Sequence, residues 1–83
     1  MTFYEWLNSK LQNMQLTRTE FAAAANVGYQ TLHPWRLNEY DPNMLTMLRI
    51  VRAVANITKQ PFNDVLADAV QYTRAYKQVT NNE

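Results

Sequence analysis

Residues 17–37 read TRTEFAAAANVGYQTLHPWRL, and this stretch carries two helix-start signals separated by a very short turn. Thr17 and Glu20 have the spacing of a capping box, in which a hydroxyl and a carboxylate satisfy backbone amides at a helix start. The alanines that follow favour a helix that another element can approach closely. Asn26 suits the left-handed end of that helix, and Gly28 suits the next N-cap. Two helices joined by so short a turn must cross at a steep angle.

The helix that begins after Gly28 is expected over residues 29–36. Its apolar residues Leu32 and Trp35 are three positions apart, so both are expected to face the core. Asn38 is expected to end this helix in the left-handed conformation.

A further helix is expected before this stretch. Thr2 and Glu5 repeat the capping-box spacing, and apolar residues then recur at helical intervals, which predicts a helix over residues 3–14. Trp6 lies on the apolar side of that helix and is expected in the core.

Two more helices are expected after the central stretch. Asp41 before Pro42 is typical of a helix start, with an N-cap carboxylate and a proline at the first helical position. The residues from 44 to 57 leave only a narrow polar strip, which indicates a buried, central helix. An apolar stripe predicts a last helix over about 62–78, and a frayed tail is expected at 80–83.

Size and composition agree with one all-α domain, a bundle of about five helices over residues 1–79. The chain has 83 residues, of which 47% are hydrophobic, and it has one glycine and three prolines, which is few for an all-β protein. It has no cysteine, no run long enough to span a membrane, and no signal peptide at its start, so we expect a cytoplasmic protein. The net charge is only +1, which gives no strongly basic footprint.

The order of caps, alanines, turn and apolar anchors resembles the phage-repressor-type helix-turn-helix of the Cro/XRE family. The resemblance runs without a gap from Leu16 to Ala55. It implies a lambda-repressor-like fold, with the helix-turn-helix at 17–37 and flanking helices before and after it. The matching residues are Leu16, Thr17, Ala22, Val27, Leu32, Trp35, Asp41, Pro42, Met44, Met47, Leu48, Ile50, Ala53 and Val54.

The resemblance implies a transcriptional regulator, such as a phage or plasmid repressor, that reads duplex DNA in the major groove with the second helix of the pair. The base-contact candidates are Tyr29, Gln30, Thr31 and His33. Gln30 can make a bidentate hydrogen bond to adenine, and Tyr29 or Thr31 can contact a thymine methyl group. Pro34 falls where the family has a residue that touches a base.

The phosphate-contact candidates surround the reading helix. Arg18 falls where the family contacts a phosphate, and Arg36, Asn38 and Tyr40 lie in or after the second helix of the pair. With a near-neutral charge, useful affinity is expected to need a homodimer. The helix at 62–78 is the candidate dimer contact, unless it packs wholly within its own chain.

Pro34 is the main departure from the family pattern. It lacks the amide that a helix interior needs, and it pushes His33 away from helical angles, so the helix must kink or stop there. This keeps an alternative open, a protein-interaction module on the same scaffold, which would bind a partner through Tyr29, Tyr40 or Tyr72. Arg49 and Arg52 are expected to form a solvated strip.

No enzymatic activity, cofactor or metal is expected. The single histidine excludes a multi-histidine metal site, and the sequence has no glycine-rich phosphate loop and no recognisable pair of catalytic carboxylates.

Overall fold

The structure is a computed structural model that describes residues 2–74, and these residues form five α-helices, one short 3-10 helix and no strand. Their all-helical class is as expected. In chain order the elements are α1 (Phe3–Met14), α2 (Arg18–Ala25), the 3-10 helix η1 (Tyr29–Leu32), α3 (Pro34–Glu39), α4 (Met44–Thr58) and α5 (Phe62–Val70).

Both capping boxes form as the spacing predicts. The Thr2 hydroxyl accepts from the Glu5 amide at 3.2 Å, and the Glu5 carboxylate accepts from the Thr2 amide at 3.0 Å. Thr17 and Glu20 make the same two bonds at 3.2 and 2.9 Å. Asn26 ends α2 in the left-handed region with a φ of 57°, as expected. The starts of α1 and α2 are therefore determined by interactions within a few residues.

The helix expected over residues 29–36 stops at His33, as the position of Pro34 predicts, and a second helix starts after it. The chain forms η1, passes through His33 in an extended conformation with ψ of 136°, and starts α3 at Pro34. The break near His33 is the one that proline chemistry predicts. At the first position of a new helix, Pro34 has no need of the amide that it lacks.

This restart changes which side chain reaches the core, and it corrects the expectation for Trp35. Leu37 is 3% exposed, whereas Trp35 is 50% exposed. Trp35 and Leu37 are two residues apart on α3, about 200° around a helix, so burying Leu37 turns Trp35 outward.

The connection from α3 to α4 also differs from expectation in two places. Asn38 is not a left-handed stop, because α3 continues to Glu39 and Tyr40 follows with φ of −132°. Asp41 does not cap α4; Asn43 does, by accepting from the Thr46 amide at 2.9 Å. The Asp41 carboxylate instead accepts a hydrogen bond from the backbone amide of Arg74 at 2.6 Å, so it makes a tertiary contact in place of the expected helix cap.

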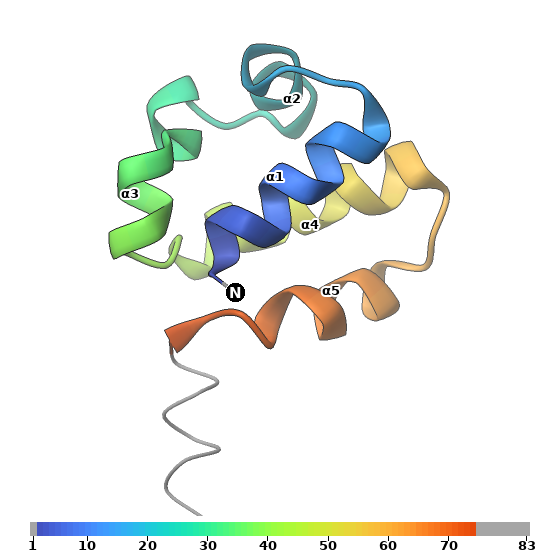
Figure 1. The fold of residues 1–83 in the computed structure, drawn as a ribbon. Helices are drawn as coiled ribbons and strands as arrows, with labels where there is room; N and C mark the ends of the chain where they lie inside the picture. The colour runs from blue at the N-terminus through green and yellow to red at the C-terminus, as the bar shows by residue number, and fades with distance from the viewer. Residues whose placement is uncertain (1, 75–83) are drawn as a thin grey trace, which may run out of the picture.

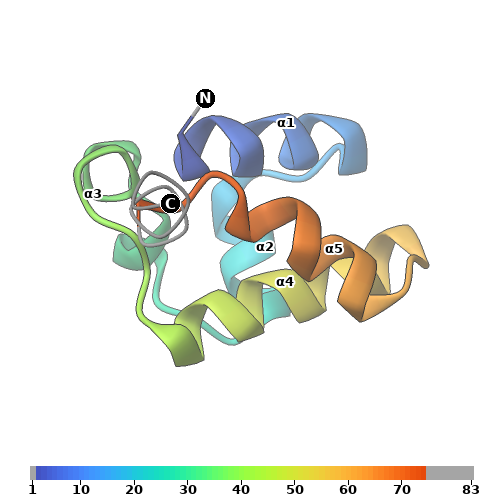
Figure 2. The ribbon, with the colours of Figure 1, turned by 90° about the horizontal axis from the view of Figure 1, so that it is seen from below.

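Helices α1 and α4 face each other across the core, with α2 on one side and α5 on the other, while α3 closes one end (Figures 1 and 2). The expected central helix is observed in α4, whose residues Met47, Ile50, Val51, Ala53, Val54 and Ala55 are buried. Trp6 is buried as expected, at 3% exposure. The largest fully buried side chains are Phe3, Phe21, Leu7, Leu32, Ile50, Val51 and Val54.

Helix α5 is shorter than expected. It ends at Val70, and a turn follows at residues 71–73. The rest of the helix expected to reach 78, and the tail at 80–83, lie outside the described residues. The apolar side of α5, including Val65 and Ala69, is buried within this chain as α5 packs on α4. Among residues 2–74, none of the helices has both the length and the apolar character needed to cross a bilayer.

Candidate nucleic-acid interface

The 3-10 helix η1 presents the first base-contact candidates at the surface. Two backbone bonds, from the Thr31 amide to the Gly28 carbonyl at 3.0 Å and from the His33 amide to the Gln30 carbonyl at 3.2 Å, define this single turn. Leu32 is fully buried and anchors it. Tyr29, 48% exposed, and Gln30 then project into solvent, while Thr31 is half-buried.

His33, the last base-contact candidate, is half-buried in the extended link between η1 and α3. Its Nδ1 atom is buried and has no hydrogen-bond partner. Its ring centroid lies 6.1 Å from that of Trp35, and the Arg36 guanidinium lies 5.6 Å from the same indole ring. A base-contact candidate and a phosphate-contact candidate therefore both lie against Trp35.

A hollow of about 260 Å³ lies between η1, α3 and the start of α4. It brings together three residues that the sequence placed in the DNA contact, namely Thr31, Arg36 and Tyr40. Its other lining residues are Leu37, Asp41, Pro42, Asn43 and Thr46. Its wall combines one exposed cation with hydroxyl and amide groups, which are the side chains that contact phosphate and sugar oxygens in protein–DNA complexes. The Asp41 carboxylate also lines it and opposes the charge of Arg36.

Asn38 and Tyr40 are both exposed, but they lie differently with respect to this hollow. Tyr40 is 60% exposed and lines it, while Asn38 does not. The Asn38 carbonyl accepts a hydrogen bond from Arg74 Nη2 at 3.1 Å, which holds the end of α3 to the segment after α5.

Arg18 is separate from this group. Its guanidinium donates to the Asn8 side chain at 3.1 Å and lies 5.0 Å from the Tyr4 ring, so it packs against α1. Arg18 does not line the hollow between η1, α3 and α4. The structure thus gives Arg18 intramolecular partners, and its phosphate contact stays a prediction.

Sequence reasoning missed the exposure of Trp35 beside the expected site, and it missed the contact that Arg49 makes there. Trp35 was expected in the core, and only the position of Pro34 signalled that the helical phase would restart there. Arg49, expected in a solvated strip, is exposed and donates to the Asn26 carbonyl at 3.3 Å, which places its charge at the turn before η1. Arg52 is also exposed but lies over the Phe62 ring, on the side of α4 that α5 covers.

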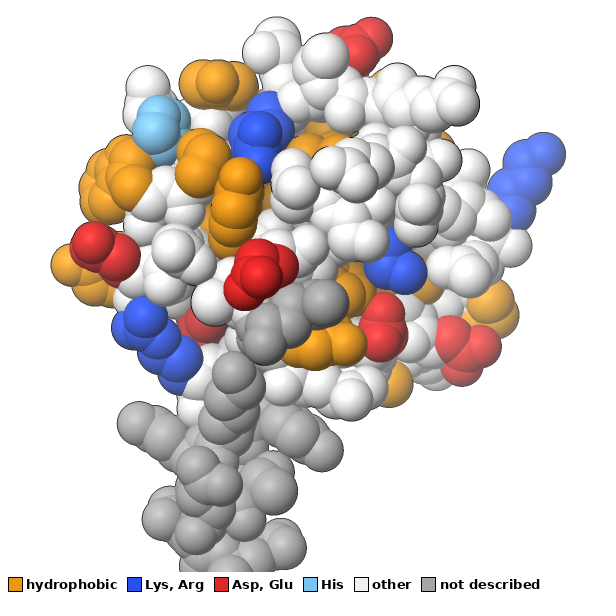
Figure 3. All heavy atoms as spheres, in the orientation of Figure 1, with side chains coloured by type: hydrophobic (Ala, Val, Ile, Leu, Met, Phe, Trp, Pro, Cys, Tyr) orange, Lys and Arg blue, Asp and Glu red, His pale blue; other side chains and the backbone are white. Residues whose placement is uncertain are grey.

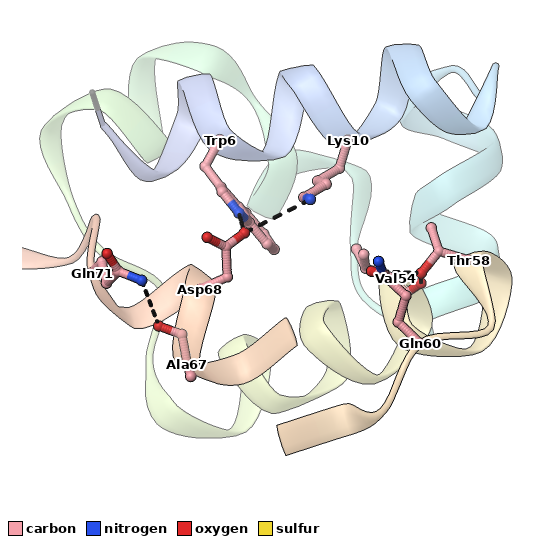
Figure 4. Close-up of polar contacts among 8 residues, drawn as sticks. All are labelled: Trp6, Lys10, Val54, Thr58, Gln60, Ala67, Asp68 and Gln71. Atoms are coloured by element: carbon pink, nitrogen blue, oxygen red, sulfur yellow. Dashed lines mark hydrogen bonds and ion pairs between the residues drawn. The ribbon is translucent and has the colours of Figure 1, made fainter. Parts of the chain in front are cut away.

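A second hollow, of about 210 Å³, lies between α1 and α5 and is lined by Lys10, Gln60, Pro61, Asp64, Val65 and Asp68. Figure 4 shows Trp6 and Lys10 of α1 directed toward Asp68 of α5 at this place. Within residues 2–74 no three His, Asp or Glu side chains are grouped so that they could hold a metal ion.

The chain matches no model of a known protein family, no curated protein and no solved structure. Its function must therefore be inferred from its own residues and their arrangement.

Proposed function

We propose that this protein is a sequence-specific regulator of transcription that binds duplex DNA in the cytoplasm, in the manner of a phage or plasmid repressor. In this proposal α2, the turn at residues 26–28, and η1 with α3 form a lambda-repressor-like helix-turn-helix. The element after the turn enters the major groove, where each base pair presents a distinct pattern of donors and acceptors.

The observation that carries the proposal is the grouping of exposed polar and cationic residues around η1. Tyr29 and Gln30 project from η1, and Thr31, Arg36 and Tyr40 surround the adjoining hollow. In this arrangement Gln30 reads a base edge, while Arg36 and Tyr40 contact the backbone beside it. These groups come from one stretch of chain anchored by Leu32 and Leu37, so they keep a fixed relation to one another.

Affinity in this proposal depends on a homodimer, because each chain offers few cations at the site. Arg36 and Arg49 lie near η1, while Glu39 on α3 is exposed nearby and opposes them. Two copies would double the phosphate contacts and place two reading elements in successive major grooves, about 34 Å apart. The apolar side of the described part of α5 packs on α4, so a dimer contact would use surface other than that side.

The test is selection of binding sites from a random duplex library, followed by salt titration of the enriched sites. An enriched two-fold symmetric motif, with an affinity that falls steeply as salt rises, is expected. Gln30→Ala should then cost roughly 1–3 kcal/mol and relax preference at one base pair. Gln12→Ala, an exposed glutamine on α1, is the matched control and should change neither property.

The alternative is a protein-interaction module, and one observation favours it. Three aromatic side chains at or near α3 are strongly exposed, namely Tyr29, Trp35 and Tyr40 at 48, 50 and 60%. Tyr72, expected as a further contact, instead packs partly buried against the core. This alternative predicts no duplex enrichment and no binding even at low salt, which the same selection measures.

A further inference from the structure

The restart of the helix at Pro34 turns Trp35 outward, so a large aromatic side chain is half exposed on α3. Tryptophan is among the most extensively buried side chains on average, and Trp6 in the same chain is 3% exposed, whereas Trp35 is 50% exposed. Figure 3 shows hydrophobic side chains gathered on the surface over α3. Contiguous exposed apolar surface is a common place for a partner molecule to bind.

The neighbours of Trp35 indicate which partner. The His33 ring lies 6.1 Å from the indole and the Arg36 guanidinium lies 5.6 Å from it, so both side chains lie beside the same indole. In the proposed function His33 meets a base edge and Arg36 meets a phosphate. A duplex that touches both side chains is brought close to the indole that they share.

We propose that Trp35 is itself a DNA-contacting residue, which lays its indole against thymine methyl groups and deoxyribose carbons beside the contacts of His33 and Arg36. This inference rests on the proposed function. Thymine methyl groups give the major groove an apolar feature that side chains recognise, and the indole offers a large, rigid surface for it. The contact supplies affinity without charge, which suits a chain whose net charge is only +1.

The first test uses the difference in exposure between the two tryptophans. Acrylamide, a neutral quencher, should reach Trp35 and not Trp6 in the free protein. Saturating the protein with an enriched duplex, with binding followed by anisotropy of labelled DNA, should abolish the accessible fraction of the fluorescence. Binding with quenching unchanged would overturn the role of Trp35 and leave the proposed function standing. No binding of any duplex at low salt would overturn both.

The second test uses substitution and separates an apolar contact from an ionic one. Trp35→Ala should weaken duplex binding roughly tenfold or more and leave the salt dependence of affinity unchanged. Arg36→Ala should instead reduce the slope of log affinity against log salt by about one. Trp35→Phe should retain most of the affinity.

The matched control is Ile57→Ala, which truncates another exposed apolar residue, 39% exposed, near the end of α4 away from α3 (Figures 1 and 2). It should bind as the unaltered protein does. An affinity of Trp35→Ala equal to that of Ile57→Ala would contradict the proposal. Because Trp35 is exposed, its truncation should leave the thermal unfolding midpoint nearly unchanged, which separates weaker binding from loss of folding.

Discussion

The indole Nε1 of Trp6 donates a hydrogen bond of 2.7 Å to Oδ2 of Asp68, which joins α1 to α5 across 62 residues of sequence (Figure 4). Lys10 Nζ lies 3.7 Å from the same carboxylate oxygen. The indole ring is buried, so its polar N–H group needs a partner, and the Asp68 side chain, 42% exposed, supplies one. This contact fixes α5 against the helix that opens the chain.

We expect Asp68→Ala to lower the free energy of unfolding by about 1–2 kcal/mol, because it leaves the buried indole N–H without an acceptor. Urea denaturation measures this change. A double-mutant cycle with Trp6→Phe isolates the pair and should give a coupling of about 1 kcal/mol. Additive effects of the two substitutions would contradict the assigned bond. Asp68→Asn, which keeps an acceptor but loses the charge facing Lys10, is the control and should cost less.

The restart of the helix at Pro34 predicts unequal effects of truncation at two neighbouring sites. Leu37→Ala should destabilise the protein by about 2–5 kcal/mol, because it empties a buried site. Trp35→Ala should change stability by about 0.5 kcal/mol or less. Thermal or urea unfolding compares the two, and Leu37→Met, which nearly conserves volume, guards against complete loss of folding. The reverse order would mean that Trp35, not Leu37, is the core anchor.

The sign of the stability change caused by Pro34→Ala shows whether Pro34 lies at a helix start or in a helix interior. At the first position of α3 the proline ring favours the observed backbone and restricts the unfolded chain. Pro34→Ala should therefore lower stability by up to about 1 kcal/mol. In the interior of a continuous helix a proline would cost about 3 kcal/mol, so there the same substitution would raise stability. Equilibrium urea unfolding of the two proteins distinguishes these outcomes.

The capping box of α2 predicts a dependence of stability on pH. The Thr17 backbone amide, and then its hydroxyl, hold the pKa of Glu20 below its ordinary value of 4.5. A carboxyl group with a lowered folded pKa stabilises the fold fully above the unfolded value, and this contribution is lost as pH falls through the folded pKa. The unaltered protein should therefore lose stability below about pH 4.5 more steeply than Glu20→Gln.

The comparison of Glu20→Gln with the unaltered protein uses urea midpoints between about pH 3 and pH 6. Glutamine at this position still accepts a hydrogen bond from the Thr17 amide, so it keeps the cap. Because glutamine does not titrate, it removes the contribution of residue 20 to the pH dependence of stability. The same dependence in both proteins would show that other carboxyl groups account for it.

Local interactions explain which parts of the fold were predictable. Both capping boxes join residues three apart, and the left-handed Asn26 depends on the preference of one side chain, so the sequence contains the whole interaction. Gln15 and Lys59 also adopt the left-handed conformation, at φ of 58° and 57°. Neither residue type favours it, so these two helix ends had no sequence signal.

Tertiary contacts explain what was not predictable. Asp41 has the sequence of an N-cap, but its carboxylate accepts a hydrogen bond from the amide of Arg74, 33 residues away. Helix α4 begins later, at Met44, with Asn43 as its N-cap. At the candidate site, Tyr29, Gln30 and Arg36 could be placed at the surface from pattern alone. The intramolecular hydrogen bond from Arg18 to Asn8 could not be predicted, because nothing in the sequence relates the two side chains.

The extended residue His33 makes η1 and α3 separate structural modules. The hydrogen bonds of η1 run between Gly28, Thr31 and neighbouring residues, while α3 is built from the His33 carbonyl onward. In a continuous recognition helix the backbone positions of all residues are coupled, since a change in the second turn shifts the backbone of the first. Here the exposed side chains of α3 could be exchanged, by evolution or by an engineer, without altering the backbone hydrogen bonds that present Gln30.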